Sequence, residues 1–141
     1  MAELTVRCSW QPAGPVVLAR GMLVFPKVPD AAGIYRFTLN DEAGARVYVG
    51  ESMRLRGRFQ HYRTPGGPGE RRTTKFRLNQ LMRETLAAGG HITAEIALQA
   101  KEVAIDGTAA ALDLGVMTDR RRAESAALAE ARSAGWVVLN R

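Results

Sequence analysis

The sequence predicts an α+β domain: a small antiparallel β-sheet flanked by about three helices, with an N-terminal extension before it. Two apolar, β-branched and aromatic runs separated by a turn-like segment indicate a β-hairpin over residues 33–50. Two later stretches carry apolar residues at helical spacing, and residues 91–100 alternate between apolar and polar side chains. The chain has 141 residues, 46% of them hydrophobic and 24% charged. These values are typical of one globular domain and exclude disordered and fibrous classes.

The N-terminal part of the chain is broken by prolines. Residues 1–31 hold two proline-containing stretches around an apolar run, so we expect an arm or extra strands there, followed by a single domain over residues 32–141. After the hairpin, Ser52 has the character of a helix N-cap. The apolar residues that follow it at i, i+4 and i+7 spacing are Leu55, Phe59 and Tyr62.

The second half of the chain alternates between loops and regular elements. A basic, glycine-rich loop lacks the lysine and hydroxyl residue of a P-loop. An Asp-Gly turn inside a segment that looks like an insertion, residues 100–118, predicts a further short strand. The expected order is loop 63–72, helix 73–88, strand 91–100, strand 108–114, helix 119–134 and a closing segment 135–140.

The charge of the chain favours an anionic partner. The formal net charge is +6, and seventeen of the twenty basic residues are arginine, whose planar fork suits phosphate. Residues 46–83 hold ten basic and two acidic side chains, a local charge of +8, whereas the rest of the chain holds ten basic and twelve acidic ones. This segment is typical of a phosphate-facing surface, and an arginine-rich solubilising face is the alternative.

Cysteine content and hydropathy bear on the compartment. Cys8 is the one cysteine, which excludes an intrachain disulfide and a cysteine-based zinc cluster. The first residues show no apolar signal region, and no apolar run approaches the ~20 residues that span a bilayer. We therefore expect a cytoplasmic protein.

A group of tyrosines and arginines is expected to converge beside the hairpin. If the turn centres between Asp41 and Glu42, Tyr35 lies directly opposite Tyr48, with both phenols on one face. On the following helix, Arg54, Arg58 and Tyr62 are spaced one turn apart and share a flank near these phenols. Such a group can hold a phosphodiester, and the alternative is that these are strand aromatics and a solvated base.

The tripeptides Gly33-Ile-Tyr35 and Tyr48-Val-Gly50, with twelve residues between them, resemble the signature of the GIY-YIG nucleases. The segment from Tyr48 to Tyr62 is similar to that family's first-helix pattern, in which Arg58 matches the catalytic arginine. Toward the C-terminus, the segment around Glu124 resembles the helix with the metal-binding glutamate, and Glu130 is a rival for that role. Asn140 resembles the asparagine that closes the domain.

The resemblance implies hydrolysis of a phosphodiester bond with one divalent metal, Mg²⁺ or else Mn²⁺. Glu124 would bind the metal, and Arg58 would stabilise the charge that grows on the phosphate. Tyr35 would accept a proton from the attacking water, with Tyr48 positioning that water. The remaining members of the implied catalytic set are Tyr62, which would orient the phosphate or water, with His61 as a substitute, and Asn140, which we expect to tie down the C-terminus.

The implied partner is nucleic acid, in the first place double-stranded DNA, bound by a monomer or homodimer. A catalytically silent nucleic-acid-binding module is the alternative from another class, and a nuclease acting on RNA or branched structures is a second. No helix-turn-helix or zinc finger is present that would supply sequence specificity. The residues expected to contact the nucleic acid are Arg54, His61, Arg63, Arg71, Arg72, Lys75 and Arg77.

Overall fold

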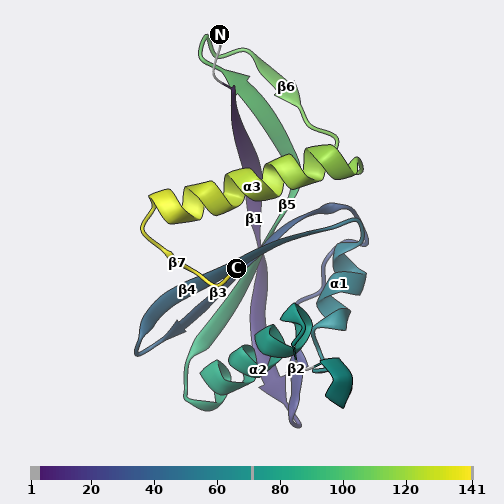
Figure 1. Ribbon diagram of the computed structural model, residues 1–141, viewed down its shortest axis with the longest axis vertical. Coiled ribbons are helices and arrows are strands. Elements are labelled where there is room, and N and C mark those ends of the chain that lie inside the picture. Colours follow the sequence, from purple (N-terminus) through teal and green to yellow (C-terminus); the bar gives the residue numbers. More distant parts are fainter. Residues whose placement is uncertain (1–3, 71, 141) are drawn as a thin grey trace.

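The described residues form a mixed, mostly antiparallel sheet that is flanked by three α-helices (Figure 1). The computed structural model describes residues 4–70 and 72–140. The strand order is β2-β1-β5-β3-β4-β7, and β6 pairs with the far end of β5. This confirms the predicted α+β class. The strands are β1 (Leu4–Ala19), β2 (Met22–Val24), β3 (Gly33–Asp41), β4 (Gly44–Ser52), β5 (His91–Ala104), β6 (Ala109–Ala111) and β7 (Val137–Val138), and the helices are α1 (Leu55–His61), η1 (Pro68–Glu70), α2 (Thr74–Ala87) and α3 (Met117–Ser133).

The hairpin β3–β4 forms as predicted, but its register differs by two residues. Its turn is Glu42-Ala43, so Tyr35 pairs with Gly50, and Tyr48 pairs with Phe37. The expected direct pairing of Tyr35 with Tyr48 is therefore wrong. Because side chains alternate with a period of two, an even shift keeps both phenols on the same face of the sheet.

The two faces of the sheet carry separate apolar cores. Odd-numbered residues of β3, such as Phe37, pack with α1 and α2, whereas Ile34 on the opposite face packs with the alanines of α3. In Figure 1, α3 lies across the upper half of the sheet, and α2 lies in the lower half with α1 beside it. The tyrosines of the hairpin therefore belong to the core of α1 and α2.

The N-terminal residues are part of the sheet. β1 pairs with β5 from Leu4 to Val16, with irregularities between Cys8 and Trp10 and between Pro12 and Gly14. Segment 100–118, which looked like an insertion, forms the end of β5, the strand β6 and the approach to α3. No helix in the described part of the chain is long and apolar enough to cross a membrane.

The helix ends differ in part from the sequence prediction. Ser52 is not an N-cap; it ends β4, and its hydroxyl accepts the Arg54 N–H and donates to the Arg54 carbonyl. The helix α1 begins after Arg54 and ends at His61, so Tyr62 lies at its C-cap. The strong cap is Thr73, whose hydroxyl accepts the Phe76 N–H at the start of α2. α3 begins two residues before the predicted position.

Candidate active site

The two glycines of the tripeptides are required by close packing. A Cβ atom on Gly33 would lie 2.6 Å from the Ala97 carbonyl oxygen and 2.8 Å from a methyl carbon of Leu55. A Cβ atom on Gly50 would overlap the phenol of Tyr35, which lies against the bare Cα of this residue. The glycine of each tripeptide thus has a steric cause: Gly33 lets Ala97 and Leu55 approach the hairpin backbone, and Gly50 makes room for the Tyr35 ring.

Tyr35 lies in the interior of the protein. Its side chain is 0% exposed, and its hydroxyl is hydrogen-bonded to the hydroxyl of Tyr62 at 2.7 Å. The rings of Phe37 and Phe59 surround it, with centroids 5.3 and 5.7 Å away. Burial, followed by the neighbouring phenols of Tyr62 and Tyr48, holds the pKa of Tyr35 well above its usual value. Tyr35 is therefore a neutral, fixed phenol at physiological pH.

Tyr48 is the half-buried member of the three tyrosines. Its ring centroid lies 6.4 Å from that of Tyr35, and its side chain also lines an open groove against α2. Burial raises the pKa of Tyr48; Tyr62 and the charge of Glu124 add to the increase, and Arg58 opposes it. These effects require Tyr62, Glu124 and Arg58 to lie close to the Tyr48 hydroxyl. Residues of three segments, β4, α1 with its C-cap, and α3, therefore lie near this phenol.

Arg58 reaches this group from the last turn of α1. Its side chain is half-buried. Burial acts to lower the pKa of the Arg58 guanidinium, but the phenols of Tyr35 and Tyr62 outweigh it and raise that pKa. Arg58 is thus a permanent cation beside the hydroxyl pair, as the sequence predicted. Arg54 does not join it, because the Arg54 guanidinium forms two hydrogen bonds with Asp30, at 2.6 and 3.2 Å.

Glu124 comes from the opposite face of the sheet, on α3. Its side chain is half-buried; burial raises the pKa of its carboxyl, Glu51 raises it further, and Arg121 and Arg58 lower it. Glu51 is held in an ion pair with the buried Arg120, one turn before Glu124 on α3. The sequence analysis missed Glu51 and Arg120, although Glu51 directly follows the second tripeptide.

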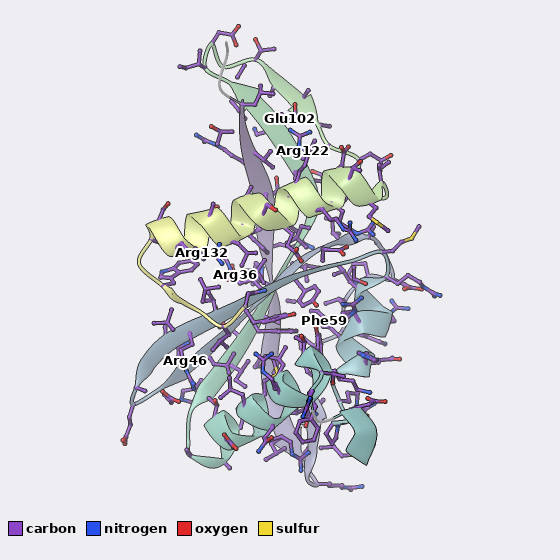
Figure 2. All side chains as sticks on the ribbon, in the orientation of Figure 1. Arg36, Arg46, Phe59, Glu102, Arg122 and Arg132 are labelled. Carbon is purple, nitrogen blue, oxygen red and sulfur yellow. The ribbon has the colours of Figure 1, made fainter. Side chains whose placement is uncertain are left out.

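Glu130 lies elsewhere on α3. Its carboxylate is 3.9 Å from a terminal nitrogen of Arg36, whose guanidinium binds Glu95 and stacks between two tryptophan rings. The Arg36 guanidinium carbon is 4.1 Å from the ring centre of Trp10 and 5.1 Å from that of Trp136. In Figure 2, Arg36 is labelled beneath the C-terminal half of α3, beside Arg132. Glu130 therefore belongs to a charged cluster separate from Glu124, whose charge acts on Tyr48.

The side-chain amide of Asn140 binds the backbone of Val49. Its side-chain oxygen accepts the Val49 N–H at 3.0 Å, and its side-chain nitrogen donates to the Val49 carbonyl at 2.6 Å. Strand β7 pairs with β4 at Arg46 and Val47, so the Asn140 amide continues the edge of β4 where β7 ends. This arrangement matches the expectation that Asn140 ties down the C-terminus, and it occupies both polar atoms of the side chain.

The basic residues expected to contact nucleic acid are distributed around α1, the loop and α2. Lys75 is 3.9 Å from the Glu70 carboxylate, whereas Arg77 lines the groove beside Tyr48. His61 is exposed, and burial, Lys75 and Arg58 lower the pKa of its imidazole. Arg63 and Arg72 are exposed, and Arg71 lies outside the described residues.

The donor set around Glu124 suits a hard divalent cation. Within residues 4–70 and 72–140, no three or more His, Cys, Asp and Glu side chains gather as a metal site. A single carboxylate ligand fits Mg²⁺, which keeps several waters and binds through one or two carboxylates plus substrate phosphate. Burial and then the charge of Glu51 raise the pKa of Glu124, and a bound cation would favour its ionised form.

Comparison with known proteins gives a likeness at the level of fold. No family model and no curated protein matches the sequence. Among solved structures, the chain is similar to a glutamate-to-alanine mutant of bacteriophage T4 EndoII, with a TM-score of 0.58 and 17% sequence identity. The match covers 94% of this chain and 92% of that chain. The predicted fold is thereby confirmed: this chain adopts the fold of the GIY-YIG nucleases.

Proposed function

We propose that this protein is a metal-dependent endonuclease that hydrolyses phosphodiester bonds in DNA. The observation that carries the proposal is the convergence of Tyr48, Arg58 and Glu124, from β4, α1 and α3, in a fold shared with an endonuclease. A cation, a carboxylate and a half-buried phenol are the groups that phosphodiester hydrolysis needs. The net charge of +6 is consistent with a polyanionic substrate.

Glu124 would hold the divalent cation, Mg²⁺ or Mn²⁺. When bound, the cation supplies positive charge next to the phosphate oxygens and makes a coordinated water more acidic. Glu124 has the properties required, because its carboxyl is half-buried and lies near Glu51, and its charge acts on Tyr48. Arg120 binds Glu51 and so keeps this second carboxylate in place beside the first.

Arg58 would stabilise the transition state. During hydrolysis a water oxygen bonds to phosphorus while the bond to the leaving sugar oxygen breaks, and negative charge grows on the phosphate oxygens; in net terms, a proton of the water passes through solvent to the leaving sugar oxygen. The Arg58 guanidinium stays protonated and is fixed beside Tyr35 and Tyr62, so it requires little reorganisation to meet this charge. Removal of such a preorganised group costs about 10²-fold or more in rate.

The three phenols divide into one that faces the substrate and two that support it. Tyr35 is 0% exposed and bonded to Tyr62, so this geometry favours Tyr48 as the phenol that orients the attacking water. The raised pKa of Tyr48 means that it stays neutral at physiological pH and acts as a hydrogen-bonding group rather than as a phenolate base. Tyr35 and Tyr62 then position Arg58.

Incubation of supercoiled plasmid with the protein tests the proposal. In Mg²⁺ we expect nicked and linear products; in EDTA we expect none. The Arg58→Ala variant should cut at least ~10²-fold more slowly while it binds DNA almost as well, because one phosphate contact among several contributes little to ground-state affinity. DNA binding with a steep salt dependence but no cutting under any metal would instead identify a silent binding module.

A further inference from the structure

A second concave surface lies on the side of α1 that faces away from the phenols. It is a groove of about 150 Å³ between α1 and the segment that follows β2. Apolar groups, among them Phe25 and Phe59, form most of the lining, and Gln60 adds an amide. Its basic lining residues are Lys27, Arg56 and Arg63.

The lining of the groove contains three basic residues and no acidic residue. Lys27 and Arg63 are exposed, and in the described part of the chain neither they nor Arg56 forms an ion pair. Asp30, an acid that the charge of Arg56 also influences, is already bound by Arg54 through two hydrogen bonds. Three cations therefore face a small concavity with their charge left for an anionic ligand.

The groove is built into the structure rather than formed by loose side chains. The Nε–H of Arg56 donates to the Val28 carbonyl at 3.1 Å, which fixes this guanidinium and ties α1 to the segment after β2. Phe25 packs on Phe59 and Tyr62, with ring centroids 5.8 and 6.4 Å apart. The groove and the candidate active site therefore share one aromatic wall, and their separation is fixed.

Helix geometry sets that separation. Arg56 and Arg58 are two residues apart on α1, so they point about 200° apart around the axis, one to the groove and one to the phenols. A helix with its side chains is about 10–12 Å across. Each strand of duplex DNA advances ~3.4 Å per nucleotide along the helix axis, so this distance measured along the axis corresponds to about three nucleotides of substrate.

We propose that this groove is a second phosphate-binding site, which holds the backbone of the same nucleic acid about three nucleotides from the cleaved phosphate. The inference rests on the proposed function and deepens it, because it gives the segment after β2 a part in substrate binding. Lys27, Arg56 and Arg63 contact the backbone and carry no base specificity. The site extends the contact of the substrate beyond the catalytic group.

Binding measurements on a Lys27→Ala, Arg63→Ala double variant test the site. The matched control is Arg7→Ala, Lys101→Ala, which removes one exposed arginine and one exposed lysine paired across β1 and β5. Affinity for a duplex of about 20 base pairs is measured in Ca²⁺ at several salt concentrations. The groove variant should lose about 0.9 in the slope of log K against log salt for each phosphate contact removed, and the control should lose nothing.

Substrate length adds a second readout. On a short hairpin duplex of about five base pairs, closed by a loop so that its strands stay paired, the groove variant and the wild type should bind equally, because the backbone does not reach the groove. Equal slopes for groove variant, control and wild type on the long duplex would overturn the inference, whether or not the protein cuts DNA. If the wild-type protein does not cut plasmid in Mg²⁺, that result would instead contradict the proposed function. Melting temperatures confirm folding, and charge reversal by Lys27→Glu and Arg63→Glu should enlarge the loss of affinity.

Discussion

Replacement of Asn140 by alanine removes both hydrogen bonds that hold the C-terminal segment on β4. The side-chain amide satisfies the N–H and the carbonyl of Val49 at 3.0 and 2.6 Å. Each such bond contributes about 1 kcal/mol net, so the free energy of unfolding should fall by about 2 kcal/mol. For a domain of this size that corresponds to a decrease of roughly 6 °C in melting temperature.

Calorimetry of wild type and Asn140→Ala measures this loss, and Val137→Ala is the matched control. Val137 lies in the same C-terminal segment but is 58% exposed, so its truncation should change stability by less than about 0.5 kcal/mol. Plasmid cleavage well below both melting temperatures gives the second readout, and Asn140→Ala should keep most of its activity there. A variant that melts like wild type yet fails to cut would refute the assignment, because Asn140 would then act on substrate.

Three further predictions concern the site and its support. Burial and Glu51 raise the folded-state pKa of Glu124, so the wild-type protein loses stability as pH rises through the range between the ordinary and the raised pKa. In EDTA at pH 8, Glu124→Gln should therefore melt no lower than wild type, and Mg²⁺ should raise the melting temperature of wild type but not of the variant. Gly50→Ala places a methyl group against the Tyr35 ring and should destabilise the fold by about 1–3 kcal/mol in urea unfolding; an unchanged midpoint would show that the contact is not tight. Arg36→Ala leaves the half-buried Glu95 without its partner and removes the guanidinium from beside two tryptophans, so it should cost about 2–3 kcal/mol, and a loss below about 1 kcal/mol would contradict a stabilising role of this part-buried ion pair.

The hairpin could be predicted because its signal is local. Alternation places Tyr35 and Phe37 on one face of β3, and Tyr48 joins them in the expected register and in the observed one, because the two registers differ by an even number of residues. The register could not be predicted in the same way, because the segment after Asn40 offers several turns. The structure selects Glu42-Ala43, where the Asp41 carboxylate accepts the Ala43 N–H.

Burial and long-range pairing could not be predicted from spacing. Tyr35 has the same local pattern as Tyr48, but the aromatic rings of α1 cover Tyr35 and leave Tyr48 half-exposed. Glu51 and Arg120 are 69 residues apart in the chain, so only the docking of α3 shows that they pair. From the sequence, either Glu124 or Glu130 could be the metal ligand. The two side chains leave α3 in different directions, and Glu130 lies near Arg36, whereas the charge of Glu124 acts on Tyr48.

Glu124 is expected to hold the metal on which cleavage depends, and a comparison of the two α3 glutamates tests this role most directly. Supercoiled plasmid is incubated in Mg²⁺ with wild type, Glu124→Gln and Glu130→Gln at equal concentrations, and the rate of nicking is measured. We expect wild type and Glu130→Gln to cut at similar rates, Glu124→Gln to cut at least ~10²-fold more slowly while it still binds DNA, and EDTA to stop all three. Normal cutting by Glu124→Gln, or cutting that EDTA leaves unchanged, would contradict this role.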